Sequence, residues 1–330
     1  MRKSFTVFGA VVAVLVLVLA FGVGCAGPAY VAGKRVAPKS PDDVVHAEAR
    51  MDTSDGLKLL VQSWKPQGES KGALVIVHGL KDYADRYADF AAACARRGYE
   101  VHALDLRGHG DSEGDRVFIN RFDEYLGDLD LFMKRVSGEA KGKPVFLMGH
   151  SMGGAIVTLY TLTEKPKLAG LITSAGALQT DAPGGLVGAV KFFSVVAPRL
   201  AVFELNDADF SRDPKVVASM ANDPLIFDGK GPARTASELL GAIARIHELG
   251  GKVNVPLLTL HGTVDKVTPP AGSAWLVSSA STTDKTEQKF EGLAHDLLHE
   301  PEAAKVVETI LGWMDSHVAP PAAPAPAATP

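Results

Sequence analysis

The chain has 330 residues, of which 46% are hydrophobic and 22% are charged, and its formal net charge is −4. Apolar content of this order is enough for a substantial core in one large domain or two small ones. Because the charge is slightly acidic and no basic block occurs, the sequence gives no basis for nucleic-acid binding.

The N-terminal residues differ in composition from the rest of the chain. Residues 5–24 (FTVFGAVVAVLVLVLAFGVG) form an apolar run after Arg2 and Lys3, which is typical of a signal peptide or a membrane anchor. Cys25 follows directly, at the position where a bacterial lipoprotein carries its lipidated thiol. We therefore expect residues 1–24 to be a signal peptide or a membrane anchor, and we favour a signal peptide that is cleaved before a lipidated Cys25. The two alternatives are an uncleaved anchor and secretion without an anchor. All three place the folded part in the bacterial cell envelope or outside the cell.

Short apolar segments alternate with amphipathic ones through the middle of the chain. Apolar, β-branched runs predict strands at 57–64, 73–78, 99–105, 144–148, 168–173, 255–260 and 287–290. Helical periodicity predicts helices at 84–97, 122–137, 152–164 and 301–316. This alternation indicates an α/β fold: a mostly parallel central sheet with helices on both faces. The first strands lie close together in the sequence, so the sheet is expected to begin with an antiparallel hairpin.

Three segments fall outside this alternation. Residues 25–46 have the composition of a linker, and residues 317–330 form an Ala/Pro-rich tail. Residues 179–251 contain no clear strand and are expected to form a helical cap over the carboxyl ends of the parallel strands, where ligands bind in open α/β sheets. The core is then 47–178 together with 252–316. Cys94, in a predicted helix, is expected to be a small buried apolar residue.

The pattern Gly-x-Ser-x-Gly occurs three times, around Ser70, Ser112 and Ser151. A serine nucleophile of this type lies on a sharp turn between a strand and a helix. Only Ser151 meets this condition, because the apolar run PVFLM precedes it and the small-residue helix GGAIVTLYTL follows it. Ser70 lies in a polar turn and Ser112 in a charged loop, so both are expected to be structural.

A serine nucleophile needs a base, and the base needs an orienting acid. Asp265 follows the predicted strand 255–260, and His295 follows the predicted strand 287–290, so both are expected beside Ser151. The backbone amides of Leu80 and Met152 are the predicted oxyanion donors. The other histidines are expected to be structural, and His299, one turn beyond His295, is expected to face solvent or cap a neighbour.

Six collinear segments carry a resemblance to a known family. They are HGLKDYADRY, DLRGHGDSEG, GHSMGG, NDPLIFDGKGPARTASELL, LHGTVDKVTPPAGSAWL and DKTEQKFEGLAHDLLHEPE. From about residue 48 to 316 the chain resembles the monoacylglycerol lipases, within the serine hydrolases that also include lysophospholipases and S33-type aminopeptidases. The resemblance implies an α/β-hydrolase fold with a mobile amphipathic cap, and a carboxylic-ester hydrolase that uses no metal or organic cofactor. It also implies that Asp82 and Arg86 order the oxyanion loop, Arg86 by pairing with a carboxylate, and we expect both side chains to bind substrate.

The cap is expected to supply the apolar lining for the acyl chain of a lipid substrate, and to help the N-terminus hold the protein at a membrane surface. The candidate lining residues are Leu186, Val187, Val190, Phe192, Phe193 and Val196. Alternative substrates are a lysophospholipid or a short-chain ester and, for an aminopeptidase, a peptide N-terminus. An aminopeptidase needs an acidic pocket for the free amine, for which Glu204, Asp207 and Asp209 are the candidates.

Overall fold

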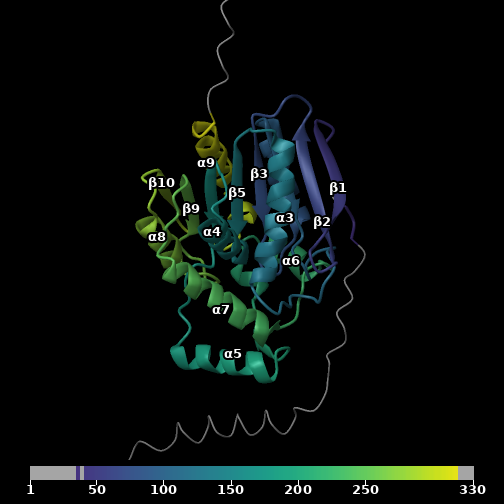
Figure 1. The fold of residues 1–330 in the computed structure, drawn as a ribbon. Coiled ribbons are helices and arrows are strands. Elements are labelled where there is room, and N and C mark those ends of the chain that lie inside the picture. The colour runs from purple at the N-terminus through teal and green to yellow at the C-terminus, as the bar shows by residue number, and fades with distance from the viewer. Residues whose placement is uncertain (1–34, 38–40, 319–330) are drawn as a thin grey trace, which may run out of the picture. The chain divides into compact units, whose positions relative to one another are not determined.

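The computed structural model describes residues 35–37 and 41–318. In this part of the chain, eight strands form one sheet in the order β1-β2-β4-β3-β5-β6-β9-β10 (Figure 1). Their bounds are Val44–Asp52 (β1), Lys58–Pro66 (β2), Gly72–Val77 (β3), Tyr99–Leu104 (β4), Val145–His150 (β5), Gly170–Ser174 (β6), Leu257–Gly262 (β9) and Lys285–Phe290 (β10). All seven predicted strands are therefore present.

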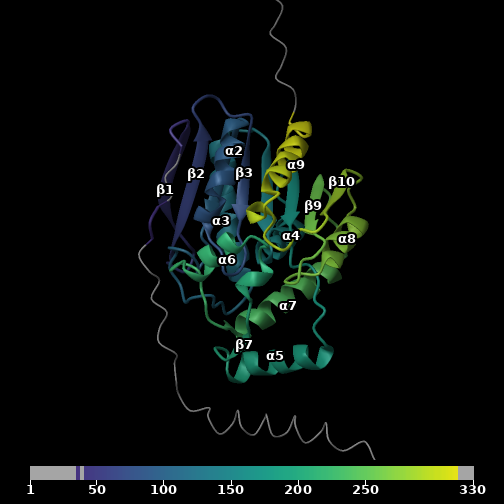
Figure 2. The same cartoon turned by 180° about the vertical axis from the view of Figure 1, so that it is seen from behind.

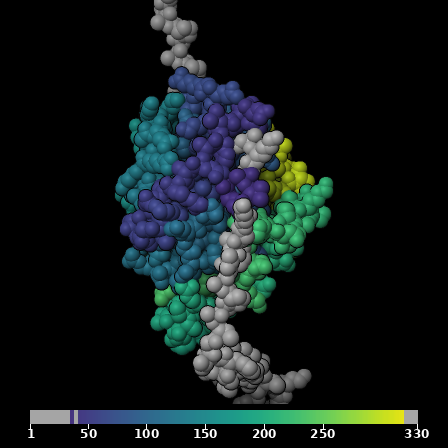
Figure 3. Space-filling model, turned by 90° about the vertical axis from the view of Figure 1, so that its right-hand side faces the viewer, coloured from purple at the N-terminus to yellow at the C-terminus, as the bar shows by residue number. Residues whose placement is uncertain are grey.

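Strand β2 is antiparallel to both of its neighbours, and the rest of the sheet is parallel. β1 pairs with β2, β2 pairs with β4 in the opposite direction, and every other neighbouring pair is parallel. The hairpin is thus β1–β2, whose strands form the purple face in Figure 3. The predicted linker 25–46 was wrong at its end, because β1 begins at Val44 and was not foreseen. β1 lies at a sheet edge, only Val44 and Met51 of its residues are buried, and Glu48, Arg50 and Asp52 are charged.

Helices cover both faces of the sheet (Figures 1 and 2). On one face lie α3 and α4, packed on Val75 and Val77 of β3, and on the other lie α2 and α9, packed on Leu74 and Ile76. The alternation along β3 follows from the pleat, which points successive side chains to opposite faces. Cys94 is fully buried in α2, as predicted. The core helices are Ala84–Tyr87 (η1), Ala88–Arg96 (α2), Asp123–Ala140 (α3), Met152–Glu164 (α4), Pro270–Ser279 (α8), Leu297–His299 (η3) and Ala303–Ser316 (α9).

Between β6 and β9 the chain leaves the main sheet and forms an insertion at its carboxyl edge. The elements are Gly184–Val196 (α5), Ala201–Phe203 (β7), Asp207–Asp209 (η2), Pro214–Ala221 (α6), Gly231–Pro232 (β8) and Ala233–Glu248 (α7). The insertion is mainly helical, and β7 and β8 pair in a small antiparallel ribbon that the sequence analysis did not predict, because both strands are too short for a sequence pattern. Helix α7 packs on α4 and on α5, and α5 lies beyond α7 as seen from the sheet (Figures 1 and 2).

The parallel strands β3, β5, β9 and β10 all end at the edge of the sheet that the insertion covers. The loops that follow them carry Leu80, Ser151, Asp265 and His295, which brings these four residues together. Within the described ranges no helix is long and apolar enough to cross a bilayer. The predicted segment 1–24 and Cys25 lie outside those ranges.

Candidate active site

Ser151 stands on the turn between β5 and α4 in a backbone conformation with φ 53° and ψ −120°. A positive φ is unfavourable for a residue with a Cβ and persists only where the surroundings impose it. Two hydrogen bonds fix the turn on the sheet, one from the Ser151 amide to Ser174 O at 3.0 Å and one from the Ala177 amide to Ser151 O at 2.9 Å. The hydroxyl therefore stands at the strand end, ahead of the helix N-terminus.

The two outer glycines of the turn let α4 approach the sheet closely. A Cβ on Gly149 would lie 2.3 Å from Gly153 O, and a Cβ on Gly153 would lie 2.1 Å from Val77 O of β3. Neither position has room for a methyl group. Backbone contact therefore requires glycine at both outer positions of GHSMG.

His295 and Asp265 form a buried hydrogen-bonded pair. Nδ1 of His295 donates to Oδ2 of Asp265 at 2.8 Å, and both side chains are inaccessible to solvent. Because a carboxylate only accepts, this bond leaves the lone pair of neutral His295 on Nε2. Nε2 is buried and has no hydrogen-bond partner among the described residues, so it is free to take a proton. No hydrogen bond joins it to the Ser151 hydroxyl in this structure.

Asp265 is held by more donors than His295 alone. Oδ2 also accepts from Nε2 of His261 at 3.0 Å, and Oδ1 accepts from the amides of Val267 and Thr268 at 2.7 and 3.0 Å. Burial by itself would raise the pKa of Asp265, but the hydrogen bonds from His261 and His295 lower that pKa below its ordinary value. Asp265 thus remains a carboxylate. The role of His261 was missed because its only sequence signal is its place four residues before Asp265.

The loop from residue 78 to 83, which follows β3 and is here called the oxyanion loop, carries the Leu80 amide. His78 fixes the start of this loop, since its Nε2 accepts from the Leu106 amide at 2.9 Å and its Nδ1 donates to Gly79 O at 2.7 Å. No hydrogen bond in the described part of the chain uses the amides of Leu80 or Met152. Both amides are therefore available to an oxygen atom near Ser151.

Asp82 and Arg86 belong to a buried ionic cluster and do not line the cavity beside Ser151, contrary to the prediction that they contact substrate. Arg86 contacts Asp82 at 2.9 Å and Asp296 at 2.5 Å, which provides the expected carboxylate partner. Oδ2 of Asp82 also accepts from the Tyr87 hydroxyl at 2.7 Å. Since Asp296 adjoins His295, the cluster joins the oxyanion loop to the loop of the candidate base.

His299 completes this cluster, so it meets the second of the two expectations, contact with a neighbour, while its side chain remains 25% exposed. Its Nδ1 lies 2.8 Å from Oδ1 of Asp296, and its Nε2 lies 2.9 Å from Arg86 O. Both partners only accept hydrogen bonds, so His299 satisfies both as an imidazolium. Burial lowers the pKa of His299, but the Asp296 carboxylate raises it more, and the net shift is upward.

A cavity of about 310 Å³ opens at Ser151, between the core and the insertion. Its lining includes Leu80 and Met152 from the core, Leu186, Val187 and Val190 from α5, and apolar residues of α7. Phe193 does not line it; its ring packs against Phe192 at 5.4 Å between centroids. No charged side chain is part of the lining.

The three acidic candidates in the insertion also lie outside this cavity. Each is paired with a lysine: Glu204 with Lys230 at 3.3 Å, Asp207 with Lys81 at 2.6 Å and Asp209 with Lys266 at 3.9 Å. They therefore form no acidic pocket beside Ser151. In residues 35–37 and 41–318, no group of three or more His, Cys, Asp or Glu side chains is placed to hold a metal ion.

The other two serines of the Gly-x-Ser-x-Gly pattern are structural in their contacts. Ser112 donates to Asp105 O at 2.6 Å and accepts from the Leu60 amide at 2.8 Å. Ser70 donates to Glu100 at 2.6 Å. Neither serine has a hydrogen bond with His295 or Asp265 among the described residues.

The sheet order, the strand–serine–helix turn after β5 and the aspartate and histidine after the last two strands define an α/β-hydrolase. A family model described as serine aminopeptidase, S33, matches residues 68–302, and the chain belongs to this family. Comparison with curated proteins and solved structures narrows the activity further.

Among curated proteins, the chain is 32% identical over 267 residues to the monoacylglycerol lipase of Mycolicibacterium smegmatis, covering 80% of this chain and 95% of the relative. It is 31% identical over 272 residues to human monoglyceride lipase, covering 81% and 89% of the two chains. The chain is therefore an enzyme that hydrolyses carboxylic esters.

Solved structures agree with this assignment. The Paleococcus ferrophilus monoacylglycerol lipase matches with a TM-score of 0.69 and 28% identity, over 83% of this chain and 99% of that one. A soluble variant of monoglyceride lipase from Saccharomyces cerevisiae, in complex with a substrate analogue, matches with a TM-score of 0.76 over 87% and 100% of the two chains, at 21% identity. The second likeness supports the fold alone.

The buried cluster predicts a pH-dependent contribution of His299 to stability. Because the folded-state pKa is raised, this contribution is fully present below the pKa of the unfolded histidine, about 6.5, and is lost as the pH rises through the folded pKa. We expect His299→Gln to lower the free energy of unfolding by about 2 kcal/mol at pH 6, and by less as the pH rises. Urea denaturation across this pH range measures the difference.

The matched control is His317→Gln, which removes a histidine paired at 3.0 Å with the exposed Asp284. The pair with Asp284 contributes little, but His317 also hydrogen-bonds Trp313 O at 2.7 Å and its ring packs on Trp313, so an effect of about 1 kcal/mol is expected. A His299→Gln deficit that grows with pH contradicts the assignment of His299 as a cation.

Proposed function

We propose that this ester hydrolase cleaves monoacylglycerols to a fatty acid and glycerol through an acyl-enzyme on Ser151. The observation that carries the proposal is the cavity at Ser151, whose lining is mainly apolar and contains no charged side chain. An acyl chain fits such a lining, because burial of its methylene groups is favourable and leaves no ionic group unpaired.

In the first half of the proposed reaction, the Ser151 oxygen attacks the ester carbonyl carbon while Nε2 of His295 takes the hydroxyl proton. Asp265 keeps Nδ1–H of His295 in place at 2.8 Å and stabilises the imidazolium that forms. The tetrahedral oxyanion accepts hydrogen bonds from the amides of Leu80 and Met152, each worth about 3 kcal/mol in the transition state. His295 then gives its proton to the glycerol oxygen as the carbon–oxygen bond breaks.

In the second half, a water molecule attacks the acyl-enzyme. His295 takes one proton from the water as its oxygen bonds to the carbonyl carbon, and returns this proton to the Ser151 oxygen when the fatty acid leaves. The same amides stabilise the second oxyanion. Free serine and neutral His295 are restored, so the cycle needs no further reactant.

The head group is proposed to be uncharged. The polar groups of the cavity lining near Ser151 are Gln179, Thr180 and Thr268, which hydrogen-bond hydroxyl groups but do not neutralise a phosphate or an ammonium group. A lysophospholipid or a peptide N-terminus would leave its charge unpaired here. A neutral glycerol head group is therefore favoured over the two charged alternatives.

The outer side of α5 is proposed to contact the membrane from which the lipid is taken. Three large apolar side chains of this helix that do not line the cavity are more than half exposed: Phe192, Val195 and Val196. Exposed apolar residues in one helix are typical of interfacial binding. Val190, on the inner side of the same helix, lines the cavity, so the helix lies between a bilayer surface and Ser151. A lipidated Cys25 or an anchor at 1–24 would hold the protein in the cell envelope at such a surface.

Labelling with a fluorophosphonate tests the nucleophile. Wild-type protein is expected to be labelled and to hydrolyse monoacylglycerols faster than lysophospholipids and aminoacyl amides. Ser151→Ala removes the attacking oxygen, so labelling should be lost and kcat/KM should fall by at least about 10⁴-fold. The control Ser70→Ala changes a serine of the same sequence pattern and is expected to be labelled like the wild type; equal labelling of Ser151→Ala would exclude the mechanism.

Narrowing the cavity tests the acyl-chain site. Val190→Trp adds a large side chain to the cavity wall, so kcat/KM for a soluble long-chain ester should fall by about tenfold or more relative to a butyrate ester. Val195→Trp places the same side chain on the exposed side of α5 and is expected to leave this ratio unchanged. An unchanged ratio in Val190→Trp would show that the acyl chain binds elsewhere.

Membrane contact is tested on two forms of substrate. The double variant Phe192→Ser with Val196→Ser removes exposed apolar area, so hydrolysis of monoacylglycerol in vesicles should fall by about tenfold, while hydrolysis of a soluble butyrate ester stays unchanged. Val45→Ser, which alters an exposed valine of β1, is the control and should change neither rate. Equal vesicle activity of the double variant would refute the docking surface.

A further inference from the structure

We propose that Arg35 is a positioning residue for the oxyanion loop, because its side chain joins strand β1 to η1, the turn that follows this loop. The inference rests on the proposed function in that Leu80 is taken as an oxyanion donor. It adds a part of the chain that the sequence marks only as linker.

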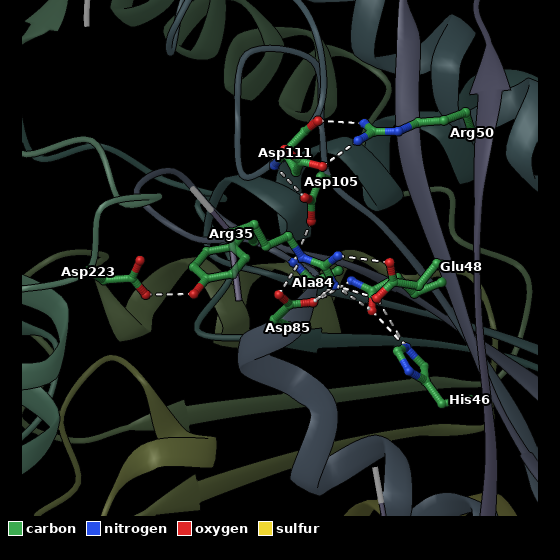
Figure 4. A network of polar contacts seen from close by, with 11 residues as sticks. Arg35, His46, Glu48, Arg50, Ala84, Asp85, Asp105, Asp111 and Asp223 are labelled. Carbon is green, nitrogen blue, oxygen red and sulfur yellow. Dashed lines mark hydrogen bonds and ion pairs between the residues drawn. The ribbon is translucent and has the colours of Figure 1, made fainter. Parts of the chain in front are cut away.

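All three nitrogens of the Arg35 guanidinium are bound by carboxylates. Nε and one terminal nitrogen donate to the two oxygens of Asp85, both at 2.6 Å, and the two terminal nitrogens donate to Glu48 of β1 at 2.8 and 2.7 Å. Figure 4 shows the guanidinium between these two carboxylates. Bidentate contacts of this kind are strong and fix geometry as well as charge. Arg35 thus binds the sheet edge and η1 at the same time.

Each residue of η1 connects to a different part of the molecule. The Ala84 amide donates to Asp105 after β4 at 2.7 Å, and Asp85 binds Arg35. Arg86 pairs with Asp296 beside His295, and the Tyr87 hydroxyl donates to Asp82 in the oxyanion loop. Only the Asp85 contact depends on the N-terminal segment. Its loss would free one side of the turn that orders the loop of Leu80.

The Arg35–Asp85 pair is almost shielded from solvent. Side-chain exposure is 9% for Arg35 and 8% for Asp85, whereas the Arg96–Asp43 pair in the same region is 52% and 55% exposed. Within the described residues, Arg35 is the one cation that pairs with Asp85. Without it, a buried carboxylate would keep only the Gln62 amide, at 2.6 Å, and unpaired buried charge is strongly unfavourable.

Asp105 is a second buried carboxylate near the Arg35–Asp85 pair. Asp105 accepts from the amides of Ala84 and Asp111 at 2.7 and 2.8 Å. Burial is the main cause that raises the pKa of Asp105 to about 7, against the hydrogen bonds from these two amides; the charge of Asp85 adds to this rise and Arg35 opposes it. Arg35 therefore reduces the repulsion between two acidic groups that both hold η1.

The test compares Arg35→Gln with the exposed control Arg96→Gln in the full-length chain, using a soluble butyrate ester. Active sites are counted by fluorophosphonate titration, so that kcat refers to folded, reactive serine only. A displaced oxyanion donor weakens the transition state and not substrate binding. We expect Arg35→Gln to lower kcat per titrated site by about tenfold and to leave KM unchanged. Arg35→Lys should retain part of the kcat that Arg35→Gln loses. Arg96→Gln should have the kcat and KM of the wild type.

Asp85→Asn removes the other half of the same contact and keeps the proposal testable if Arg35→Gln folds poorly. Because both changes break one interaction, the double variant should lose no more than the larger single loss. Multiplicative losses, or a wild-type kcat per site in Arg35→Gln, overturn the inference. A wild type that is inactive and unlabelled would overturn the proposed function as well. An active, labelled wild type with an unaffected Arg35→Gln variant would overturn only the role of Arg35.

Discussion

The close approach of α4 to the sheet at the end of β5 is the constraint from which the arrangement of the site follows. Gly149 and Gly153 allow backbone contact in which an added Cβ would lie little more than 2 Å from a carbonyl oxygen. This contact leaves Ser151 on a turn with φ 53°, which L-residues seldom adopt. This strained conformation is held in place because the turn is also hydrogen-bonded to Ser174 of β6 and to Ala177 in the loop after β6. The helix N-terminus and the Met152 amide then lie beside the serine hydroxyl.

The loops around Ser151 are joined to one another by buried polar contacts more than by apolar packing. Asp265 accepts hydrogen bonds from His295, His261 and two backbone amides. Arg86 and Asp296 connect the oxyanion loop with the loop of His295, and Lys81 connects the oxyanion loop with Asp207 of the insertion. Such contacts are strong only when every partner is satisfied. The cavity wall, by contrast, is apolar. Polar contacts therefore set the positions of the loops around Ser151, whereas apolar contacts are available to the substrate.

The strands and the positions of Ser151, Asp265 and His295 follow from the sequence because they depend on local patterns: apolar runs, glycines at a turn and the order of strand ends. β1 was missed because an edge strand with alternating charged residues has no apolar run. His261, Asp296 and His299 were missed as partners because their contacts join residues that no spacing rule connects. Arg35 lies in a segment with the composition of a linker, and its partners Asp85 and Glu48 are 50 and 13 residues away. Contacts of this range need the fold to be known.

The binding of Arg35 to the core also limits how far a lipidated form of the protein would stand from its membrane. If Cys25 carries the lipid, as proposed above, ten residues separate it from Arg35, and a fully extended chain of this length spans at most about 36 Å. So short a connection would give the enzyme a high effective concentration near the bilayer surface. Its encounters with lipid would then be set by lateral diffusion within the membrane, and not by the concentration of enzyme in the surrounding water.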